Sequence, residues 1–221
     1  MLMTFAATLL TALAVSAETD TTFAVKPGTR LEVSNFGGEI AVQSWDKNAV
    51  HVEATHSERV RISIEDSECC LTISASNRRG VPARVDYHIT VPPWMALTLS
   101  GVYTDVSVEG TKAEVSAETV NGDVTYLGSI EEGGRYRFAS HNGDLILGLP
   151  DHINAAISVA TFSGDFRSDF PVRISETRKG HRFDFTLGSG SAQIELETFQ
   201  GTVWLRRGEE KMKLKTKEDD R

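Results

Sequence analysis

Apolar and polar residues alternate along almost the whole chain after Glu18. Clear examples are the runs 60–64, 85–91 and 183–187, in which every second residue is apolar. An alternation of period two places the apolar residues on one face of a β-strand. The chain after Glu18 has no comparable run with the 3.6-residue apolar period of an amphipathic helix. The pattern therefore predicts an all-β fold of many short strands, each with one face toward the core.

Glycines recur at a regular interval in the second half of the chain. Gly101, Gly122, Gly143 and Gly164 are equally spaced, and the last three are followed by Asp and an apolar residue, in the segments NGDV, NGDL and SGDF. A similar segment, FQGTV, contains Gly201 after a longer interval, whereas an alignment of 104–106 with 122–124 gives a shorter one. This self-similarity predicts a repeat of about 21 residues.

A chain that repeats a short strand, a glycine turn and a second short strand is typical of a β-solenoid, or β-helix-like stack, in which each coil lies on the previous one. A series of hairpins is the alternative, because Asn-Gly is also a strong hairpin signal. The recurrence of equivalent residues favours stacking. Residues 18–95 have longer strands and less regular spacing, and they include Pro92-Pro93 near their end. We expect this section to be a meander that caps the first coils.

Residues 1–17, MLMTFAATLLTALAVSA, contain no charged side chain and end in small residues. This pattern predicts a secretory signal peptide cleaved after Ala17, with a buried N-terminal helix as the alternative. No later run reaches the roughly 20 apolar residues of a membrane helix. We therefore expect one domain over 18–207, a charged and frayed tail over 208–221, and export to the periplasm, the cell surface or the medium.

The charge balance and the cysteines limit the functions further. The chain has 23 Lys and Arg against 31 Asp and Glu, a net charge of −8, which argues against a nucleic-acid partner. Its two cysteines, Cys69 and Cys70, are adjacent. The alternation predicts that Cys69 points inward and Cys70 outward. A disulfide between neighbours is strained, so we expect one buried and one exposed thiol. A vicinal redox pair or an intermolecular bridge is the alternative.

Several segments together resemble a known family. They are NFGGEIAVQSW at 35–45, VHV at 50–52, and the NGDV, NGDL and SGDF segments with Leu149-Pro150 between the last two. Over residues 20–207 this pattern resembles the DUF4097 family of bacterial adhesin-like proteins. The resemblance implies an exported or cell-envelope protein with repeated β-strands and a solenoid-like fold. It implies no enzymatic activity, and it assigns no catalytic or ligand-binding residues to this chain.

The sequence contains none of the common catalytic signatures. A G-x-S-x-G elbow, a Walker A loop, H-E-x-x-H and C-x-x-C are all missing. The histidines have no metal-ligand spacing; they are residues 51, 56, 88, 141, 152 and 181. We therefore expect a protein that is not an enzyme and that has no cofactor.

One set of carboxylates could still form a site. Asp123, Asp144 and Asp165 follow the repeated glycines, and they would form a ladder on stacked coils about 4.8 Å apart. Calcium suits oxygen ligands of this kind. Aspartate also bonds to the backbone of its own turn, which explains each residue separately. We expect structural turn residues, with a cation or sugar site as the alternative.

Outward-facing residues offer a second binding surface. The polar ones are Thr125, Arg135, Arg137, Thr161, Glu195, Glu197 and Thr202. The aromatic ones that could form platforms, or else pack in the core, are Tyr103, Tyr126, Tyr136 and Trp204. The leading hypothesis is an exported, non-enzymatic, adhesin-like binding or scaffold module whose partner is an envelope protein or a glycan. The alternatives are a polysaccharide-cleaving β-helix enzyme and an accessory protein of envelope-stress signalling.

Overall fold

The computed structural model describes residues 16–77, 80, 82–172, 175–176 and 181–208. These residues form strands joined by turns: β1 (Ser16–Ala24), β2 (Arg30–Ser44), β3 (Ala49–Ser57), β4 (Val60–Asp66), β5 (Cys70–Asn77), β6 (Arg84–Val91), β7 (Ala96–Glu109), β8 (Val115–Asn121), β9 (Val124–Leu127), β10 (Arg135–Asn142), β11 (Leu145–Leu149), β12 (Ala155–Ser163), β13 (Phe166–Ser168), β14 (Ser175–Glu176), β15 (His181–Leu187), β16 (Ala192–Gln200) and β17 (Val203–Arg207). The all-β prediction is confirmed. Within the described ranges, nothing forms a helix long and apolar enough to cross a membrane.

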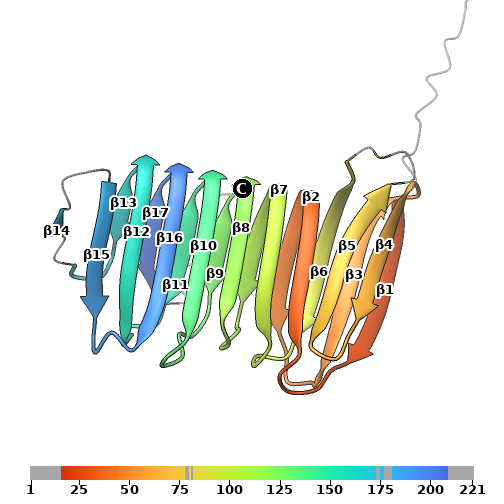
Figure 1. The fold of residues 1–221 in the computed structure, drawn as a ribbon, viewed down its shortest axis with the longest axis horizontal. Helices are drawn as coiled ribbons and strands as arrows, with labels where there is room; N and C mark the ends of the chain where they lie inside the picture. The colour runs from red at the N-terminus through yellow and green to blue at the C-terminus, as the bar shows by residue number, and fades with distance from the viewer. Residues whose placement is uncertain (1–15, 78–79, 81, 173–174, 177–180, 209–221) are drawn as a thin grey trace, which may run out of the picture.

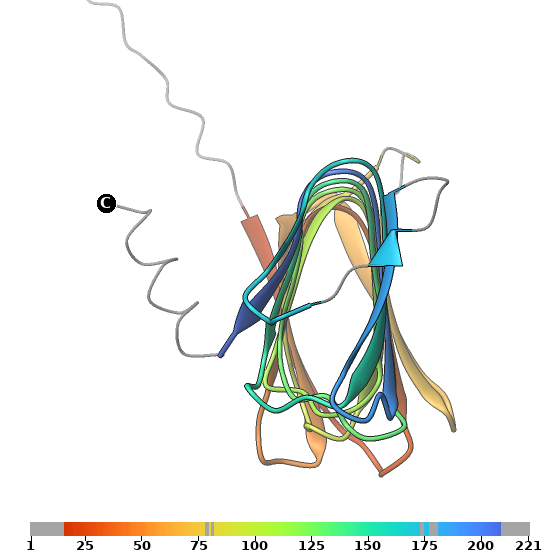
Figure 2. The same cartoon turned by 90° about the vertical axis from the view of Figure 1, so that its left-hand side faces the viewer.

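The strands form one hydrogen-bonded sheet that folds over on itself. We call its two halves the first and the second sheet. The first sheet faces the viewer in Figure 1 and runs β14-β15-β12-β16-β10-β8-β7-β2-β5-β4. The second sheet lies behind it and runs β13-β17-β11-β9-β7-β2-β6-β3-β1. The long strands β2 and β7 belong to both, and the view along the stack shows the two sheets as a flattened tube (Figure 2).

Neighbouring coils from β2 to β13 pair in parallel, so the alternative of consecutive hairpins is wrong for this part of the chain. The spacing of paired residues varies, however. Leu97 pairs with Val115, whereas Val115 pairs with Tyr136, which is a longer step along the chain. Gly101 pairs with Thr119 and is therefore not equivalent to Gly122. The regular repeat predicted from the glycines is not confirmed, since the coils are related by different intervals.

The order of the coils in space also differs from their order in the chain. The last coil, β16 and β17, lies between the coil of β10 and β11 and the coil of β12 and β13 (Figure 1). Leu196 pairs with Phe138 on one side and with Val159 on the other, both in parallel. The longer interval between Gly164 and Gly201 therefore marks a return of the chain to a position between two earlier coils.

The core lies between the two sheets and follows the alternation of the strands. Phe138, for example, is fully buried between its neighbours Ala117 and Leu196, which are also fully buried. Complete burial of a large apolar side chain contributes about 1.5–3 kcal/mol. Tyr126 and Tyr136 are buried, so for these two residues packing in the core is confirmed and the alternative of a surface platform is wrong.

A column of hydroxyl groups ties each coil to the next. Thr119, Ser140 and Thr198 occupy equivalent positions and donate to the carbonyl oxygens of Thr104, Gly122 and Gly143, at 2.8, 2.8 and 3.1 Å. Thr161 occupies the same column and is buried, so its predicted outward orientation is wrong. The turns beside this column are so close that a Cβ at Gly143 would overlap the carbonyl oxygen of Gly122. Glycine is needed there because the backbones touch.

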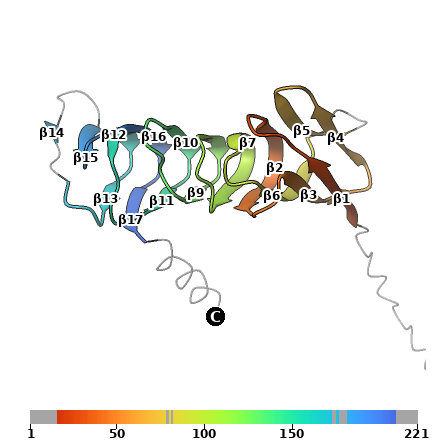
Figure 3. The ribbon, with the colours of Figure 1, turned by 90° about the horizontal axis from the view of Figure 1, so that it is seen from below.

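Antiparallel strands lie at both ends of the stack. At the N-terminal end β3 pairs with β6 and with β1, and β4 pairs with β5; Figure 3 shows these strands from below. β2, which falls in the section expected to be an irregular meander, instead forms a complete coil paired in parallel with β7. At the other end β15 runs antiparallel to β12. The predicted signal peptide lies outside the described residues except for Ser16 and Ala17, which begin β1, and of the predicted tail only Gly208 is described.

Candidate functional site

The predicted aspartate ladder lies on the turns between the two sheets. Asp123 Oδ1 accepts the backbone N–H of Asp144 at 2.8 Å, and Asp144 Oδ1 accepts the N–H of Thr202 at 2.7 Å. Asp105, one coil earlier, accepts the N–H of Asp123 in the same way at 2.9 Å. Each of these carboxylates therefore caps the turn of the next coil. A carboxylate that accepts backbone N–H groups needs no cation to be stable at such a position.

The ladder does not bring all three predicted residues together. Thr202 lies between Asp144 and Asp165, because the last coil of the chain is inserted there. Asp165 instead lies 3.6 Å from the guanidinium of Arg167. Among the described residues, three possible metal-ligating side chains converge in one place, at Asp20, His51 and Glu53, which are far from the ladder on β1 and β3.

The outer face of the first sheet carries a charge cluster centred on Arg137 of β10. Its guanidinium donates to Glu118 at 2.8 Å, to Glu195 at 2.6 Å and to Glu197 at 3.3 Å. Glu118 is on β8 and the other two are on β16, the strands on either side of β10. Hydrogen bonds to Glu118 and then Glu195 raise the pKa of Arg137 above its ordinary value. We call Arg137 and these three glutamates the Arg137 cluster.

Two hollows lie on this face, and Arg137 lines both. The first has a volume of about 720 Å³ and extends from Arg137 past Ser116 toward Arg30 on one side, and past Ser158 toward Asp184 on the other. The second has a volume of about 700 Å³ and is lined by Ala139 and Ala160, between the glutamates of the cluster and the rim. Short outward side chains leave these spaces open, because they do not fill the surface between longer neighbours.

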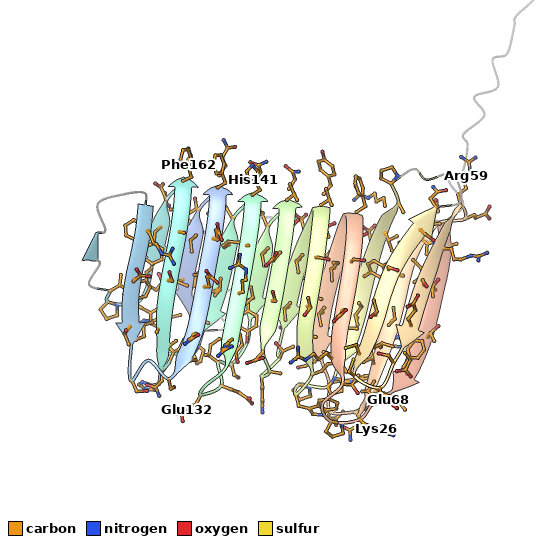
Figure 4. The ribbon with its side chains drawn as sticks, in the orientation of Figure 1. Lys26, Arg59, Glu68, Glu132, His141 and Phe162 are labelled. Carbon is orange, nitrogen blue, oxygen red and sulfur yellow. The ribbon has the colours of Figure 1, made fainter. Side chains whose placement is uncertain are left out.

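Three apolar side chains and the ring of a histidine form a row along the rim above the second hollow. Val120, His141, Phe199 and Phe162 occupy consecutive positions of β8, β10, β16 and β12, and Figure 4 shows His141 and Phe162 on this rim. The rings of Phe199 and Phe162 are stacked with centroids 4.6 Å apart, and His141 stacks on the other side of Phe199 at 4.7 Å. Phe162, at the end of the row, is 67% exposed. We call these four residues the apolar rim.

Part of this surface is predictable from the sequence. Arg137, Glu195 and Glu197 were expected to face outward, and they do. Glu118, the rim phenylalanines and His141 were not identified. A signal was present, since each rim residue stands directly before the Asn, Gln or Ser that precedes a repeated glycine. Tyr103 is exposed as a platform would be, whereas Trp204 lies on the second sheet between the guanidinium groups of Arg167 and Arg206, each 4.7 Å from its ring.

The cysteines differ from their predicted arrangement. Cys69 is exposed in the turn between β4 and β5, and Cys70 is only half-buried at the start of β5. The prediction of one buried and one exposed thiol is therefore wrong. The alternation that suggested it begins only at Cys70, because Cys69 still belongs to the turn.

Solved structures of other proteins are similar to this architecture. A candidate cell adhesion protein of Clostridium sporogenes has a TM-score of 0.62 at 14% sequence identity, and the match covers 87% of this chain and all of that one. A candidate adhesin of Bacteroides fragilis matches over 87% of this chain and 97% of its own, with a TM-score of 0.36 and 11% identity. At such identities the likeness to the first protein shows the fold alone. No curated protein matches the sequence.

The family comparison agrees with the resemblance seen in the sequence. The model of the family described as Toastrack DUF4097 matches residues 95–206. This range begins just before β7 and includes the Arg137 cluster and the apolar rim. The chain belongs to the Toastrack DUF4097 family.

Proposed function

We propose that the protein is an exported, non-enzymatic, adhesin-like binding module of the cell envelope, and that the outer face of its first sheet binds a glycan chain. The observation that carries this proposal is the second hollow, whose alanines lie between the charged groups of the Arg137 cluster and the apolar rim. A binding site for a polar ligand typically combines apolar surface with a few well-placed polar groups. The signal-like segment at residues 1–17 supports export.

The chemistry of the hollow suits a sugar. Sugar rings present C–H groups on their faces and hydroxyl groups at their edges. Arg137, Glu118 and Glu197 offer planar donors and acceptors for the hydroxyl groups. Phe199 covers one face of the Phe162 ring, and the other face can pack on a sugar ring. Alanines at 139 and 160 leave room for the ring between these groups.

The shape of the surface suits a linear ligand. The two hollows meet at Arg137, and together they extend across the strands from Arg30, on β2, to Asp184, on β15. A chain of sugar units that lies across the strands would contact several coils in succession. The three glutamates of the Arg137 cluster all pair with the same guanidinium, which supports a role in recognition and not in acid–base catalysis.

The test is binding of the purified protein to an array of envelope polysaccharides. We expect Phe162→Ala and Arg137→Ala each to weaken binding about tenfold, equivalent to about 1.4 kcal/mol. Trp204→Ala and Arg167→Ala are the matched controls, because they remove the same residue classes from the second sheet. Circular dichroism confirms that each variant is folded.

Three results would contradict the proposal. If the controls weaken binding as much as the variants, the ligand does not bind at this face. If the protein binds envelope material only while its proteins are intact, the partner is a protein and not a glycan. Release of cut sugar fragments would show that the module is an enzyme.

A further inference from the structure

The two adjacent cysteines lie in a turn whose hydrogen bonds hold the backbone of both residues in place. Ser67 Oγ donates to the carbonyl oxygen of Cys70 at 2.8 Å and accepts its N–H at 3.2 Å. The N–H of Ser67 donates to the same carbonyl at 2.9 Å. The carbonyl of Cys69 accepts the N–H of Arg30, on the neighbouring strand, at 2.9 Å. The turn therefore holds the two Cα–Cβ bonds side by side before any reaction.

The sulfur atoms themselves are in contact. Cys69 Sγ and Cys70 Sγ are 2.7 Å apart, whereas a disulfide bond is about 2.05 Å long. Both side chains are accessible, since Cys69 is exposed and Cys70 is half-buried. Figure 4 labels Glu68, the residue before Cys69, at the outer edge of the turn. A reagent from solvent can therefore approach Cys69.

We propose that Cys69 and Cys70 form a redox-active dithiol site that takes a low-molecular-weight or protein disulfide as its oxidant and closes to a vicinal disulfide. Cys69 Sγ, as thiolate, attacks one sulfur of the external disulfide and releases the other half as a thiolate. Cys70, after losing its proton to water, attacks Cys69 Sγ and expels the second half. The protein loses two protons and two electrons, and one external disulfide becomes two thiols.

The surroundings of the two cysteines determine which thiol reacts first. Hydrogen bonds from Cys70 and then Ser67 lower the pKa of Cys69, which favours its thiolate as the attacking group. The hydrogen bond with Cys69 and then partial burial raise the pKa of Cys70 to about 11. Exposed Cys69 therefore reacts first and Cys70 second. The site does not depend on the proposed glycan binding, although Arg30, which pairs with Cys70, also lines the first hollow.

The product is expected to open again easily. Consecutive Cα atoms are about 3.8 Å apart, less than the roughly 4.4 Å minimum common in disulfides. A strained, exposed disulfide is more readily reduced than a structural one. The site would therefore exchange with its surroundings and would not act as a permanent staple.

The experiment exposes the reduced full-length protein to oxidised glutathione and follows intact mass and free thiols. We expect the thiol count to fall from two to none, with the loss of two hydrogens, no bound glutathione and a monomeric product. The second step should be independent of protein and glutathione concentration, and excess reduced glutathione should restore both thiols. Cys70→Ser should stop at a glutathione adduct on Cys69, and Cys69→Ser should form no ring.

Other products would overturn the inference. These are a disulfide-linked dimer, a chain that carries glutathione on both cysteines, or two thiols that remain free while an unfolded control of the same chain is oxidised. Both serine variants alter a surface turn, so their circular dichroism should match that of the parent protein. If it does not, the mass and thiol count of the unmodified chain still decide the result.

Discussion

Arg137 shows how one side chain can organise a surface through partners that are distant in sequence. Its three glutamates lie 19, 58 and 60 residues away, yet all are on the two strands next to it. An exposed ion pair taken alone stabilises a fold very little. The cluster matters more for geometry, because three contacts hold the planar guanidinium in one orientation between the two hollows. A ligand would therefore meet a donor group that is already positioned.

Tyr87 on β6 is a residue with the opposite character, because it is fully buried and polar. Its hydroxyl has no hydrogen-bond partner within the described part of the chain, and burial raises its pKa. Burial therefore favours the neutral phenol in the folded state. The contribution of Tyr87 to the free energy of unfolding is fully present below the ordinary tyrosine pKa of about 10. It is lost as the pH rises through the higher pKa of this group in the folded state.

Tyr87→Phe should make the protein less sensitive to alkali. Since the change removes an unpaired buried hydroxyl, we expect it to be neutral or to stabilise the fold by about 1 kcal/mol near neutral pH. The urea midpoint of the variant should fall less than that of the parent above about pH 10. Tyr103→Phe at an exposed site is the control. An equal alkaline loss in the parent and in Tyr87→Phe would refute the assignment to Tyr87.

At the scale of elements, the turns between the two sheets are the most specialised parts of the stack. Gly122, Gly143, Gly201 and Gly164 follow one another along them, and at each of the four a Cβ would overlap a carbonyl oxygen of the preceding coil. Asn142 Nδ2 donates to Asn121 Oδ1 at 2.9 Å just before these glycines. The aspartates that follow complete the turns by binding backbone N–H groups.

Asp144→Ala should destabilise the fold by about 1–3 kcal/mol, because the N–H of Thr202 would lose its acceptor. Asp144→Asn should cost less, since the amide oxygen can still accept that hydrogen bond. If the ladder is purely structural, neither calcium nor a chelator should change the melting temperature of the parent protein. A calcium-dependent rise in melting temperature that Asp144→Asn abolishes would instead establish a cation site.

For the whole molecule, the position of the last coil is the main feature of the topology. β16 and β17 have a neighbouring strand on each side although they follow the other strands in the chain, so the coils on both sides pair with them. Leu196 is fully buried there, and its pairing partners Phe138 and Val159 come from earlier parts of the sequence. The stability of the coils on both sides should therefore depend on the last coil.

Leu196→Ala should cost about 2–5 kcal/mol, as expected for a large-to-small change in a core. Hydrogen exchange should become faster in both β10 and β12, its neighbours in space. Leu71→Ala in β5 is the matched control, because Leu71 is also fully buried but lies toward the N-terminal end. Faster exchange in β12 alone or in β10 alone would show that the coil does not couple the two.

The sequence predicted the fold class well and the assembly of the stack only in part. Alternation identified strands because it is a local property, and the Gly-Asp segments marked the turns correctly at 122, 143 and 164. Gly101 was misassigned, since equal spacing alone cannot show which residues pair. The Arg137 cluster depends on Glu118 and on an inserted strand, so its geometry is set by tertiary pairing. The rim phenylalanines had a sequence signal that becomes informative only when the coils are aligned.

The insertion of the last coil has a consequence for how the chain reaches its native state. Val159 follows Phe138 at the same interval at which Tyr136 follows its partner Val115, so β12 could stack directly on β10 in a regular register before β16 arrives. Such pairing would be a kinetic competitor built into the sequence itself. The native arrangement also has many contacts between distant residues, and a high contact order slows folding. The native stack can be completed only after β16 and β17 have been synthesised. A chain that stays unfolded until then avoids the competing pairing of β12 with β10.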